Sequence, residues 1–451
     1  MNRSYILHKR TATFLLAACA LLASHTAFAA IPIQSWTQAN GAKIYLVEAQ
    51  GIPMVDVQID FDAGSRRDPA DKAGLAGVTA SLTSKGIQAR GTEQALDENA
   101  LGEAWADLGA SFGASAGSDR MSFSLRSLSY PDLLAKSVAL AARQMGEPAF
   151  PEAVWLRERQ RIGASLKEAN TRPATIAGRT FTQAVYGGHP YGYEMTEETL
   201  ARIDTAQMRA LYTSLMAPCR AKVSIVGAVT RAQADAMVKT LLSRVPNAAS
   251  TSCAALAPVA DVPALAKAAD LRVPFVSAQA HVFIGQPGYK RDDPDFFPLT
   301  VGNYILGGGG FVSRLTEEVR EKRGLSYSVY SYFSPGLHAG AFTVGLQTRP
   351  DQAVQAVQVS RDVIAKFVAE GPTEAELKAA KDNLIGGFAL RIDSNRKLLD
   401  NVANIAWNNL ALDYLDTWTQ QVDKVTAADI KAAMARKLQP EKMVTVVVGG
   451  E

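Results

Sequence analysis

The sequence contains an internal duplication, which constrains the possible folds more than any other feature. Residues 203–227 match residues 425–449 without a gap, at a shift of 222 positions. Each copy predicts a capped amphipathic helix that ends near a proline, followed by a strand rich in β-branched residues. Two weaker matches follow the same order: 55–61 with 278–284, and Phe123-Ser124-Leu125 with Phe342-Thr343-Val344. The chain is therefore expected to consist of two homologous halves.

Each half mixes two periodicities, and this mixture predicts the fold class. Alternating apolar residues indicate strands, and apolar residues three or four apart indicate amphipathic helices. One second-half helix places on a single face Ala353, Val357, Ile364, Phe367 and Val368. Gly371-Pro372 ends this helix, and Thr373 with Glu376 predicts a capping box for the next one. We expect an α+β fold of two homologous α/β sandwich halves with mainly antiparallel sheets.

A segment of different composition separates the halves. Residues 247–265 are rich in alanine, serine and proline and show little periodicity, which is typical of a linker. The halves are therefore predicted at residues 30–246 and 266–451. Each lies in or near the usual size range of a domain.

Residues 1–29 predict a secretory signal peptide. Arg3, Lys9 and Arg10 supply the positive start, residues 11–22 a mostly apolar stretch, and Ala27-Phe28-Ala29 a cleavage site. Polar residues at 24–26 keep the apolar stretch shorter than the ~18–20 residues that a membrane span needs. Leu16-Ala17-Ala18-Cys19 also resembles a bacterial lipobox, so lipidation at Cys19 is the minor alternative to simple cleavage.

The composition excludes several classes of protein. Hydrophobic residues make up 47% and charged residues 20%, which excludes a mostly disordered chain, a collagen-like fibre and a polytopic membrane protein. Loss of the signal peptide removes three positive charges from a net charge of +3, so the mature chain is neutral. We therefore expect no nucleic-acid partner, and no transmembrane segment after signal cleavage.

Few residues remain for familiar catalytic chemistry. The mature chain keeps only His189, His281 and His338, none of them close enough in sequence for a paired zinc motif on a helix. The run Gly307–Gly310 lacks the Lys-Ser or Lys-Thr of a phosphate loop, and a close approach of a peptide backbone explains it better.

The two remaining cysteines leave one question open. Cys219 and Cys253 can form a disulfide in an oxidising compartment, but the sequence does not show whether they meet. Without nearby histidines they do not predict a zinc site.

One stretch of the second half resembles a known family. Ser313-Arg314-Leu315 follows the glycine run, and Arg320 and Tyr327 lie seven residues apart. This pattern resembles the zinc peptidases of the insulinase/pitrilysin family, which includes mitochondrial processing peptidase. The resemblance covers nearly all of the mature chain, including His189-Pro190-Tyr191-Gly192 and the prolines Pro218 and Pro440.

The catalytic motif of that family is missing. Active members carry His-x-x-Glu-His on the first long helix, and the lead-in Gly74-Leu75-Ala76 places Gly77, Ala80 and Ser81 at the His, Glu and His positions. Glu158 falls where the resemblance places the third ligand, also a glutamate. A catalytic zinc needs about three protein ligands, and its water needs a general base. We therefore expect no metal in this chain, and no peptide cleavage by the chain alone.

The resemblance implies the other half of a split active site. Bacterial members of this size often work as two chains, one with zinc and one with the arginine and tyrosine. We expect Arg320 and Tyr327 to be catalytic in a partner's site, and Gly308, Gly309, Gly310, Ser313 and Arg314 to bind substrate. The implied partners are a homologous zinc-bearing peptidase chain and an unfolded peptide, and the implied location is the periplasm. The alternative is a peptide-binding or scaffold protein of the cell envelope with the same fold.

Overall fold

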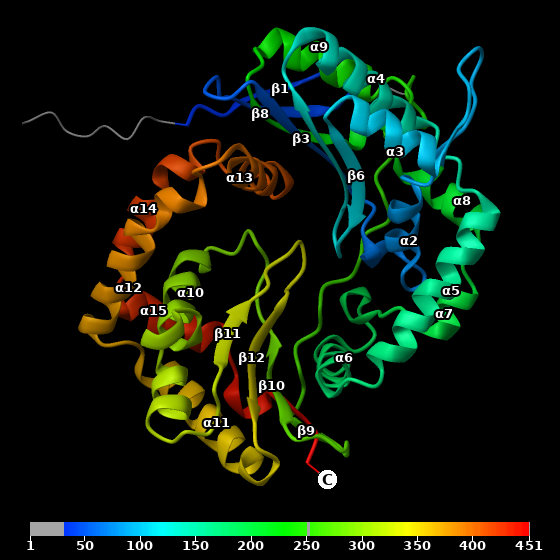
Figure 1. Cartoon of the computed structure of the whole chain (residues 1–451). Helices are drawn as coiled ribbons and strands as arrows, with labels where there is room; N and C mark the ends of the chain where they lie inside the picture. The colour runs from blue at the N-terminus through cyan, green and yellow to red at the C-terminus, as the bar shows by residue number, and fades with distance from the viewer. Residues whose placement is uncertain (1–30, 250–252, 451) are drawn as a thin grey trace, which may run out of the picture. The chain divides into compact units, whose positions relative to one another are not determined.

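The computed structural model describes residues 31–249 and 253–450 (Figure 1). The expected signal peptide and Cys19 lie outside the described residues. Among the described residues no helix is both long and apolar enough to cross a membrane.

The first half is built on a six-stranded sheet. In spatial order its strands are β1 (Gln34–Thr37), β2 (Lys43–Glu48), β8 (Lys222–Gly227), β3 (Met54–Phe61), β7 (Met121–Leu128) and β6 (Ser111–Ala116). Only β2 and β8 pair in parallel. A separate two-stranded ladder joins β4 (Gly86–Ile87) to β5 (Leu96–Asp97).

The second half repeats this order without the outermost strand. Its strands are β11 (Val329–Phe333), β12 (Ala341–Thr348), β10 (Ala280–Pro287), β13 (Val444–Val448) and β9 (Ala269–Val273). Again one pair is parallel, β13 with β9, at the position equivalent to β8 with β2. The expected pair of α/β halves with mainly antiparallel sheets is confirmed.

Helices cover the sheets in both halves. The first half contains α2 (Leu75–Leu82), α3 (Glu98–Asp107), α4 (Pro131–Gly146), α5 (Glu152–Ala169), α6 (Pro173–Tyr186), α7 (Glu197–Ala201), α8 (Thr205–Leu215) and α9 (Arg231–Leu241). The second half contains α10 (Phe296–Asn303), α11 (Ala353–Glu370), α12 (Glu374–Gly386), α13 (Asn395–Trp407), α14 (Tyr414–Lys424) and α15 (Ala427–Lys437). Gly371, at φ 77°, ends α11, and the predicted capping box of Thr373 and Glu376 opens α12.

In the main duplicated segment, residues that are 222 positions apart in sequence occupy equivalent positions in the two halves. Helices α8 and α15 both open with capping boxes, from Asp204 and Thr426, and lead through a turn at Pro218 or Pro440 into β8 and β13. The two weaker sequence matches pair the correct strands in the wrong register. Asp56 lies opposite Val226 and His281 opposite Val448, so the equivalent positions are two residues from those aligned in sequence. An alignment error of two residues keeps every side chain on the same face of a strand, because side chains alternate between the two faces. The pattern of apolar residues therefore does not reveal it.

The halves exchange equivalent helices. Helix α6 of the first half packs on β10 and β13 of the second sheet, and α13, which lies at the same shift of 222, packs on β8 and β3 of the first sheet (Figure 1). The α6 contact is apolar, with Ala177, Phe181 and Val185 against Val444, Val446 and Val448. The α13 contact is polar, because Asp60 and Lys222 are on the face of the sheet that it covers.

The connection between the halves contains no helix or strand from residue 253 to residue 268. Its backbone is nevertheless held at several points. Arg220 donates to the carbonyl of Ala254 and Arg67 to that of Ala257, and His189 Nε2 lies 2.9 Å from that of Ala260. The connector is therefore bound along the surface of the first half.

Candidate functional site

Helix α2 carries Gly77, Ala80 and Ser81, which are expected to correspond to the family's zinc motif. Gly77 has open space where a Cβ would be, whereas Ala80 is 1% exposed. Ser81 is exposed, and its hydroxyl donates to the carbonyl of Gly77 at 3.0 Å. None of these three side chains offers a nitrogen or carboxylate ligand.

Glu158, the expected counterpart of the family's third zinc ligand, is paired with cations. Its oxygens lie 2.8 Å from Arg161 Nε, 3.4 Å from an Arg157 nitrogen and 3.8 Å from Lys85 Nζ. The hydrogen bond from Arg161 and the nearby positive charges hold the pKa of Glu158 below its usual value. Positive side chains thus balance the negative charge of Glu158, as a bound metal ion would.

The same cations are shared with a second carboxylate. Lys85 Nζ lies 2.5 Å and an Arg157 nitrogen 2.7 Å from Glu98, and these two hydrogen bonds lower the pKa of Glu98. Lys85, Glu98 and Arg157 also line a pocket of about 700 Å³ together with Ile87, Leu96 and Val154. Over residues 31–249 and 253–450, no cluster of three or more His, Cys, Asp or Glu side chains could hold a metal ion. The residues present do not fit the family's zinc.

The glycine run of the second half is required by close packing. A Cβ on Gly307 would lie 2.4 Å from Ser331 Oγ, and one on Gly309 would lie 2.7 Å from the carbonyl of Tyr304. Gly308 belongs to a π-helical turn (Tyr304–Gly308), and Gly310 has φ 64°. The run therefore has a structural role whether or not it contacts a substrate.

Ser313 and Arg314 have partners inside the second half. Ser313 is fully buried, and its hydroxyl donates to the carbonyl of Gly310 at 2.8 Å. Arg314 makes two hydrogen bonds to Glu376, of 2.6 and 2.8 Å, and a third to the carbonyl of Gly371. These side chains fix the segment that precedes Arg320.

Arg320 and Tyr327 lie against each other. Arg320 is on a π-helical turn (Thr316–Glu321), and Gly324, at φ 61°, reverses the chain so that Tyr327 returns beside it. The guanidinium carbon lies 4.6 Å from the Tyr327 ring centroid and 4.7 Å from that of Phe311. Tyr327 is 83% and Phe311 71% exposed. Sequence reasoning missed Phe311, although its position directly after the glycine run was a usable signal.

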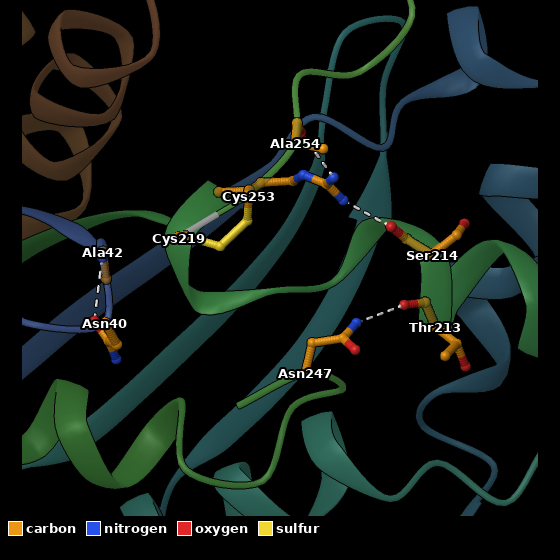
Figure 2. Close-up of a disulfide and its surroundings, with 9 residues drawn as sticks. Asn40, Ala42, Thr213, Ser214, Cys219, Asn247, Cys253 and Ala254 are labelled. Carbon is orange, nitrogen blue, oxygen red and sulfur yellow. Dashed lines mark hydrogen bonds between the residues drawn. A yellow bond between two sulfur atoms is a disulfide. The ribbon is translucent and has the colours of Figure 1, made fainter. Parts of the chain in front are cut away.

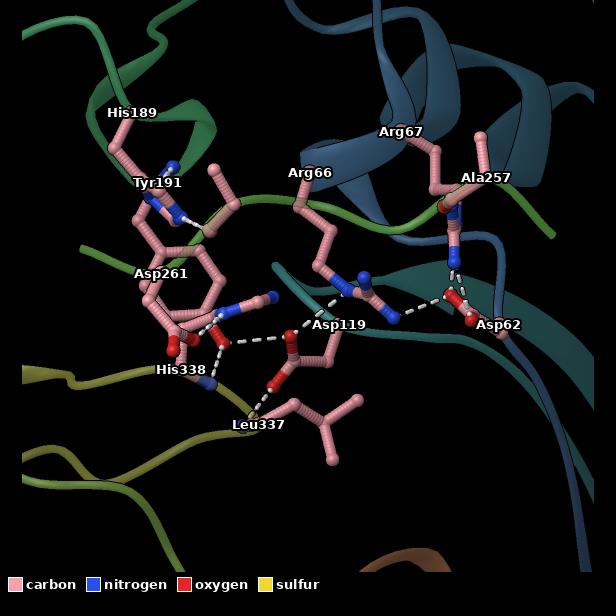
Figure 3. A network of polar contacts seen from close by, with 11 residues as sticks. Asp62, Arg66, Arg67, Asp119, His189, Tyr191, Ala257, Asp261, Leu337 and His338 are labelled. Carbon is pink, nitrogen blue, oxygen red and sulfur yellow. Dashed lines mark hydrogen bonds and ion pairs between the residues drawn. The ribbon is translucent and has the colours of Figure 1, made fainter.

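Two of the three histidines meet in a polar network between the halves (Figure 3). The rings of His189 and His338 lie 5.2 Å apart, and His338 Nδ1 lies 3.2 Å from Asp261 of the connector. Tyr191 donates to Asp119 at 2.6 Å and accepts from the backbone N–H of His338. His281 lies apart on β10. The network joins the first half, the connector and the second half.

Cys219 and Cys253 form a disulfide, with their Cα atoms 5.8 Å apart (Figure 2). It ties the start of the connector to the turn that precedes β8. Arg220 reinforces this attachment, because it donates to the carbonyls of Ser214 and Ala254. The structure thereby answers the question that the sequence left open.

Comparison with known proteins supports the fold. The model of the insulinase family (peptidase family M16) matches residues 43–199, and that of the peptidase M16 inactive domain matches residues 202–384. The crystal structure of a peptidase M16 inactive domain from Pseudomonas fluorescens is 33% identical and covers 93% of this chain and 98% of its own, with a TM-score of 0.86.

Curated relatives carry different names. The uncharacterized zinc protease YmxG of Bacillus subtilis is 24% identical over 91% of this chain and 96% of its own length. The non-peptidase homolog YmxG of Helicobacter pylori is 34% identical over 156 residues, 34% of this chain and 35% of its own. This chain has the two-domain peptidase fold of these matches. It belongs to the insulinase (M16) peptidase family.

Proposed function

We propose that this chain is a metal-free subunit of a heterodimeric zinc peptidase and supplies Arg320 and Tyr327 to the zinc site of a homologous partner chain. One observation carries the proposal: the exposed ring of Tyr327 packs against the guanidinium of the half-buried Arg320, while Glu158 is paired with arginine and lysine. The two parts of a peptidase site have thus diverged within one chain.

The chemistry of the pair suits a peptidase. A phenol can donate a hydrogen bond to the oxyanion that forms when water attacks a peptide carbonyl, and such a donor is typically worth about 2.7–4 kcal/mol of barrier. The planar guanidinium can hold a substrate carbonyl or carboxylate by two parallel N–H groups. No hydrogen bond engages the Tyr327 hydroxyl in the part of the chain that the structure describes, so it is available to a substrate.

The substrate-binding contribution of the glycine segment is proposed to come from its backbone. Gly308, Gly309 and Gly310 carry no side chains that would block an extended peptide. Ser313 and Arg314 contribute indirectly, because their side chains already have partners. We retain residues 30–246 and 266–451 as the two homologous halves and 247–265 as their linker.

We further propose that the chain acts in the periplasm with unfolded peptides as substrates. The predicted signal peptide supports export. The disulfide supports an oxidising compartment, because such bonds rarely persist in the cytosol.

The test is a peptidase assay on a quenched unstructured peptide with zinc content measured in parallel. The secreted chain is assayed alone and mixed with a homologous chain that carries an intact His-x-x-Glu-His motif. We expect activity only in the mixture, with zinc in the partner. Arg320→Ala and Tyr327→Phe are expected to lower turnover at least tenfold, equivalent to about 1.4 kcal/mol, without dissociating the complex.

Two exposed residues provide matched controls. Arg323→Ala removes an arginine that pairs with Glu318, and Tyr130→Phe removes an exposed hydroxyl of the first half. Both are expected to leave turnover unchanged. Unchanged turnover in Arg320→Ala and Tyr327→Phe as well would refute the shared site and favour the scaffold alternative.

A further inference from the structure

We propose that Phe311 is a positioning residue, which holds the guanidinium of Arg320 in the orientation that the shared active site uses. This inference rests on the function proposed above. It also gives Gly310, the last glycine of the run, a role, because its φ of 64° begins the turn that carries Phe311.

The geometry places Arg320 between two aromatic rings. Its guanidinium carbon lies 4.7 Å from the Phe311 centroid and 4.6 Å from the Tyr327 centroid, both within the range of cation–π attraction. Phe311 and Tyr327 make no ring contact with each other within residues 31–249 and 253–450, so each ring packs on the guanidinium separately. A guanidinium whose carbon packs against two rings still has N–H groups that can bind a substrate.

The backbone around Phe311 is built to hold it there. Gly310, at φ 64°, turns the chain into a single 3₁₀ turn (Gly310–Val312) that contains Phe311. The buried hydroxyl of Ser313 closes this turn by its bond to the carbonyl of Gly310. On the other side, the paired hydrogen bonds of Arg314 to Glu376 anchor the start of the π-helical turn that carries Arg320. The ring and the guanidinium are thus fixed by separate anchors that are only a few residues apart.

Without Phe311 the guanidinium has a competing partner close by. Arg320 Nε already lies 3.3 Å from the carboxylate of Glu321, which is more than half exposed. An arginine with one face open can rotate further onto this carboxylate, and its hydrogen-bonding edge would then be occupied. Small displacements of a positioning group cost catalysis more than binding, because the transition state depends on alignment.

A burial role for Phe311 makes a different prediction. Phe311 is 71% and its neighbour Val312 73% exposed, so both could serve as apolar contacts for the partner chain. An apolar contact would tolerate leucine, since leucine offers similar apolar area. A positioning role by cation–π stacking requires an aromatic ring and would tolerate tyrosine.

The experiment compares Phe311→Leu, Phe311→Tyr and Val312→Ala in the complex with the zinc-bearing chain. We expect Phe311→Leu to lower kcat about five- to tenfold with little change in KM, and the other two variants to keep wild-type kcat. In the secreted chain alone, the Nε–Hε signal of Arg320, followed by selective arginine labelling, should lose the part of its ring-current shift that Phe311 contributes in Phe311→Leu and keep it in Phe311→Tyr.

The outcomes separate this inference from the proposed function. If Arg320→Ala lowers turnover but Phe311→Leu does not, or if the Arg320 signal is the same in Phe311→Leu and the wild type, Phe311 has no positioning role. If Arg320→Ala itself leaves turnover unchanged, the proposed function fails. If Phe311→Leu keeps wild-type kcat while Val312→Ala weakens the complex with the partner chain, the two residues form an apolar contact and the positioning role is overturned.

Discussion

The ammonium group of Lys222, on β8 of the first half, donates a 2.8 Å hydrogen bond to the carbonyl oxygen of Trp407, at the end of α13 in the second half. It also donates to the carbonyl of Ala406 and to Asn409 Oδ1. The last carbonyls of a helix lack partners within the helix, and a cation at this end is favoured by the helix dipole. One lysine of the first half thus caps a helix of the second.

This cap predicts a pH dependence of stability. Burial lowers the pKa of Lys222 to about 8 from its usual 10.5. Between these values the unfolded chain binds more protons at this position, so the free energy of unfolding should rise with pH through this window. The rise should be about 1–2 kcal/mol between pH 8 and 10, after allowance for solvent screening.

Chemical denaturation of the wild type and Lys222→Gln at several pH values measures this contribution. The stability difference between the two proteins should shift in favour of the wild type from pH 8 to 10, since other groups cancel. Lys239→Gln, at an exposed position on α9, serves as the control for loss of a lysine charge. A constant difference across the range would contradict the buried cap.

The exchange of α6 onto the second sheet predicts that Phe181 stabilises both halves. Phe181 is 5% exposed, and its ring centroid lies 5.6 Å from that of Phe283 on β10. Phe181→Ala should lower the free energy of unfolding by about 3–5 kcal/mol, because it removes a buried ring and leaves a cavity. Val354→Ala, at a position 65% exposed, should change it by no more than about 0.5 kcal/mol. Equal effects of the two substitutions in denaturant titrations would refute the packing.

The helix exchange could not have been read from the sequence. Periodicity shows that α6 has an apolar face containing Ala177 and Phe181, but not which sheet covers that face. The duplication and the capping boxes were predictable because they depend on residues close in sequence. Strand register was misjudged by two positions, since pattern alone does not distinguish shifts that keep the same face.

In the candidate site, too, features that depend on nearby residues were predictable and contacts between distant segments were not. The motif pattern points to Gly77, Ala80, Ser81 and Glu158, but it does not show the cations that pair with Glu158. Lys85 comes from a different part of the chain than Arg157 and Arg161, and only the fold brings it to this carboxylate. Pattern also could not show that Arg314 is paired internally.

The disulfide predicts a measurable stabilisation. Cys219 and Cys253 are 34 residues apart, and closing a loop of this length restricts the unfolded chain by about 3–4 kcal/mol. The double variant Cys219→Ser/Cys253→Ser should lose this amount in equilibrium unfolding. A reductant should destabilise the wild type to a similar extent and leave the double variant unaffected. If the reductant also destabilises the double variant, its effect on the wild type does not come from this disulfide.

The pair of Arg314 and Glu376 predicts stability that is lost in acid. Two hydrogen bonds from Arg314 lower the pKa of Glu376 to about 2. Because the folded-state pKa lies below the usual 4.5, the contribution is complete above pH 4.5 and disappears as pH falls toward 2. Glu376→Gln should cost about 1–2 kcal/mol at neutral pH and progressively less in acid.

Denaturation of Glu376→Gln and the wild type between pH 2 and pH 7 tests this pair. Glu374→Gln, an exposed glutamate in the first turn of the same helix, is the control and should show a smaller and flatter difference. A cost of Glu376→Gln that stays the same at pH 2 would contradict the depressed pKa.

The cations around Glu158 predict that restoring the motif alone will not restore a metal site. The variant Gly77→His/Ala80→Glu/Ser81→His supplies the missing groups, but Glu158 remains bound to Arg157 and Arg161. A carboxylate must leave such partners before it can bind zinc, so the cost of breaking both pairs weakens zinc binding.

Adding Arg157→Ala and Arg161→Ala to this triple variant should therefore tighten zinc binding by about tenfold or more, as measured by competition with a chromophoric chelator. Adding Glu158→Gln to the five-residue variant should reverse the gain, because it removes the ligand that the arginines release. A control with Arg159→Ala in place of the two arginine substitutions should bind no better than the triple variant. If the triple variant already binds zinc as tightly as the five-residue variant, the cations are not what keeps a metal from this site.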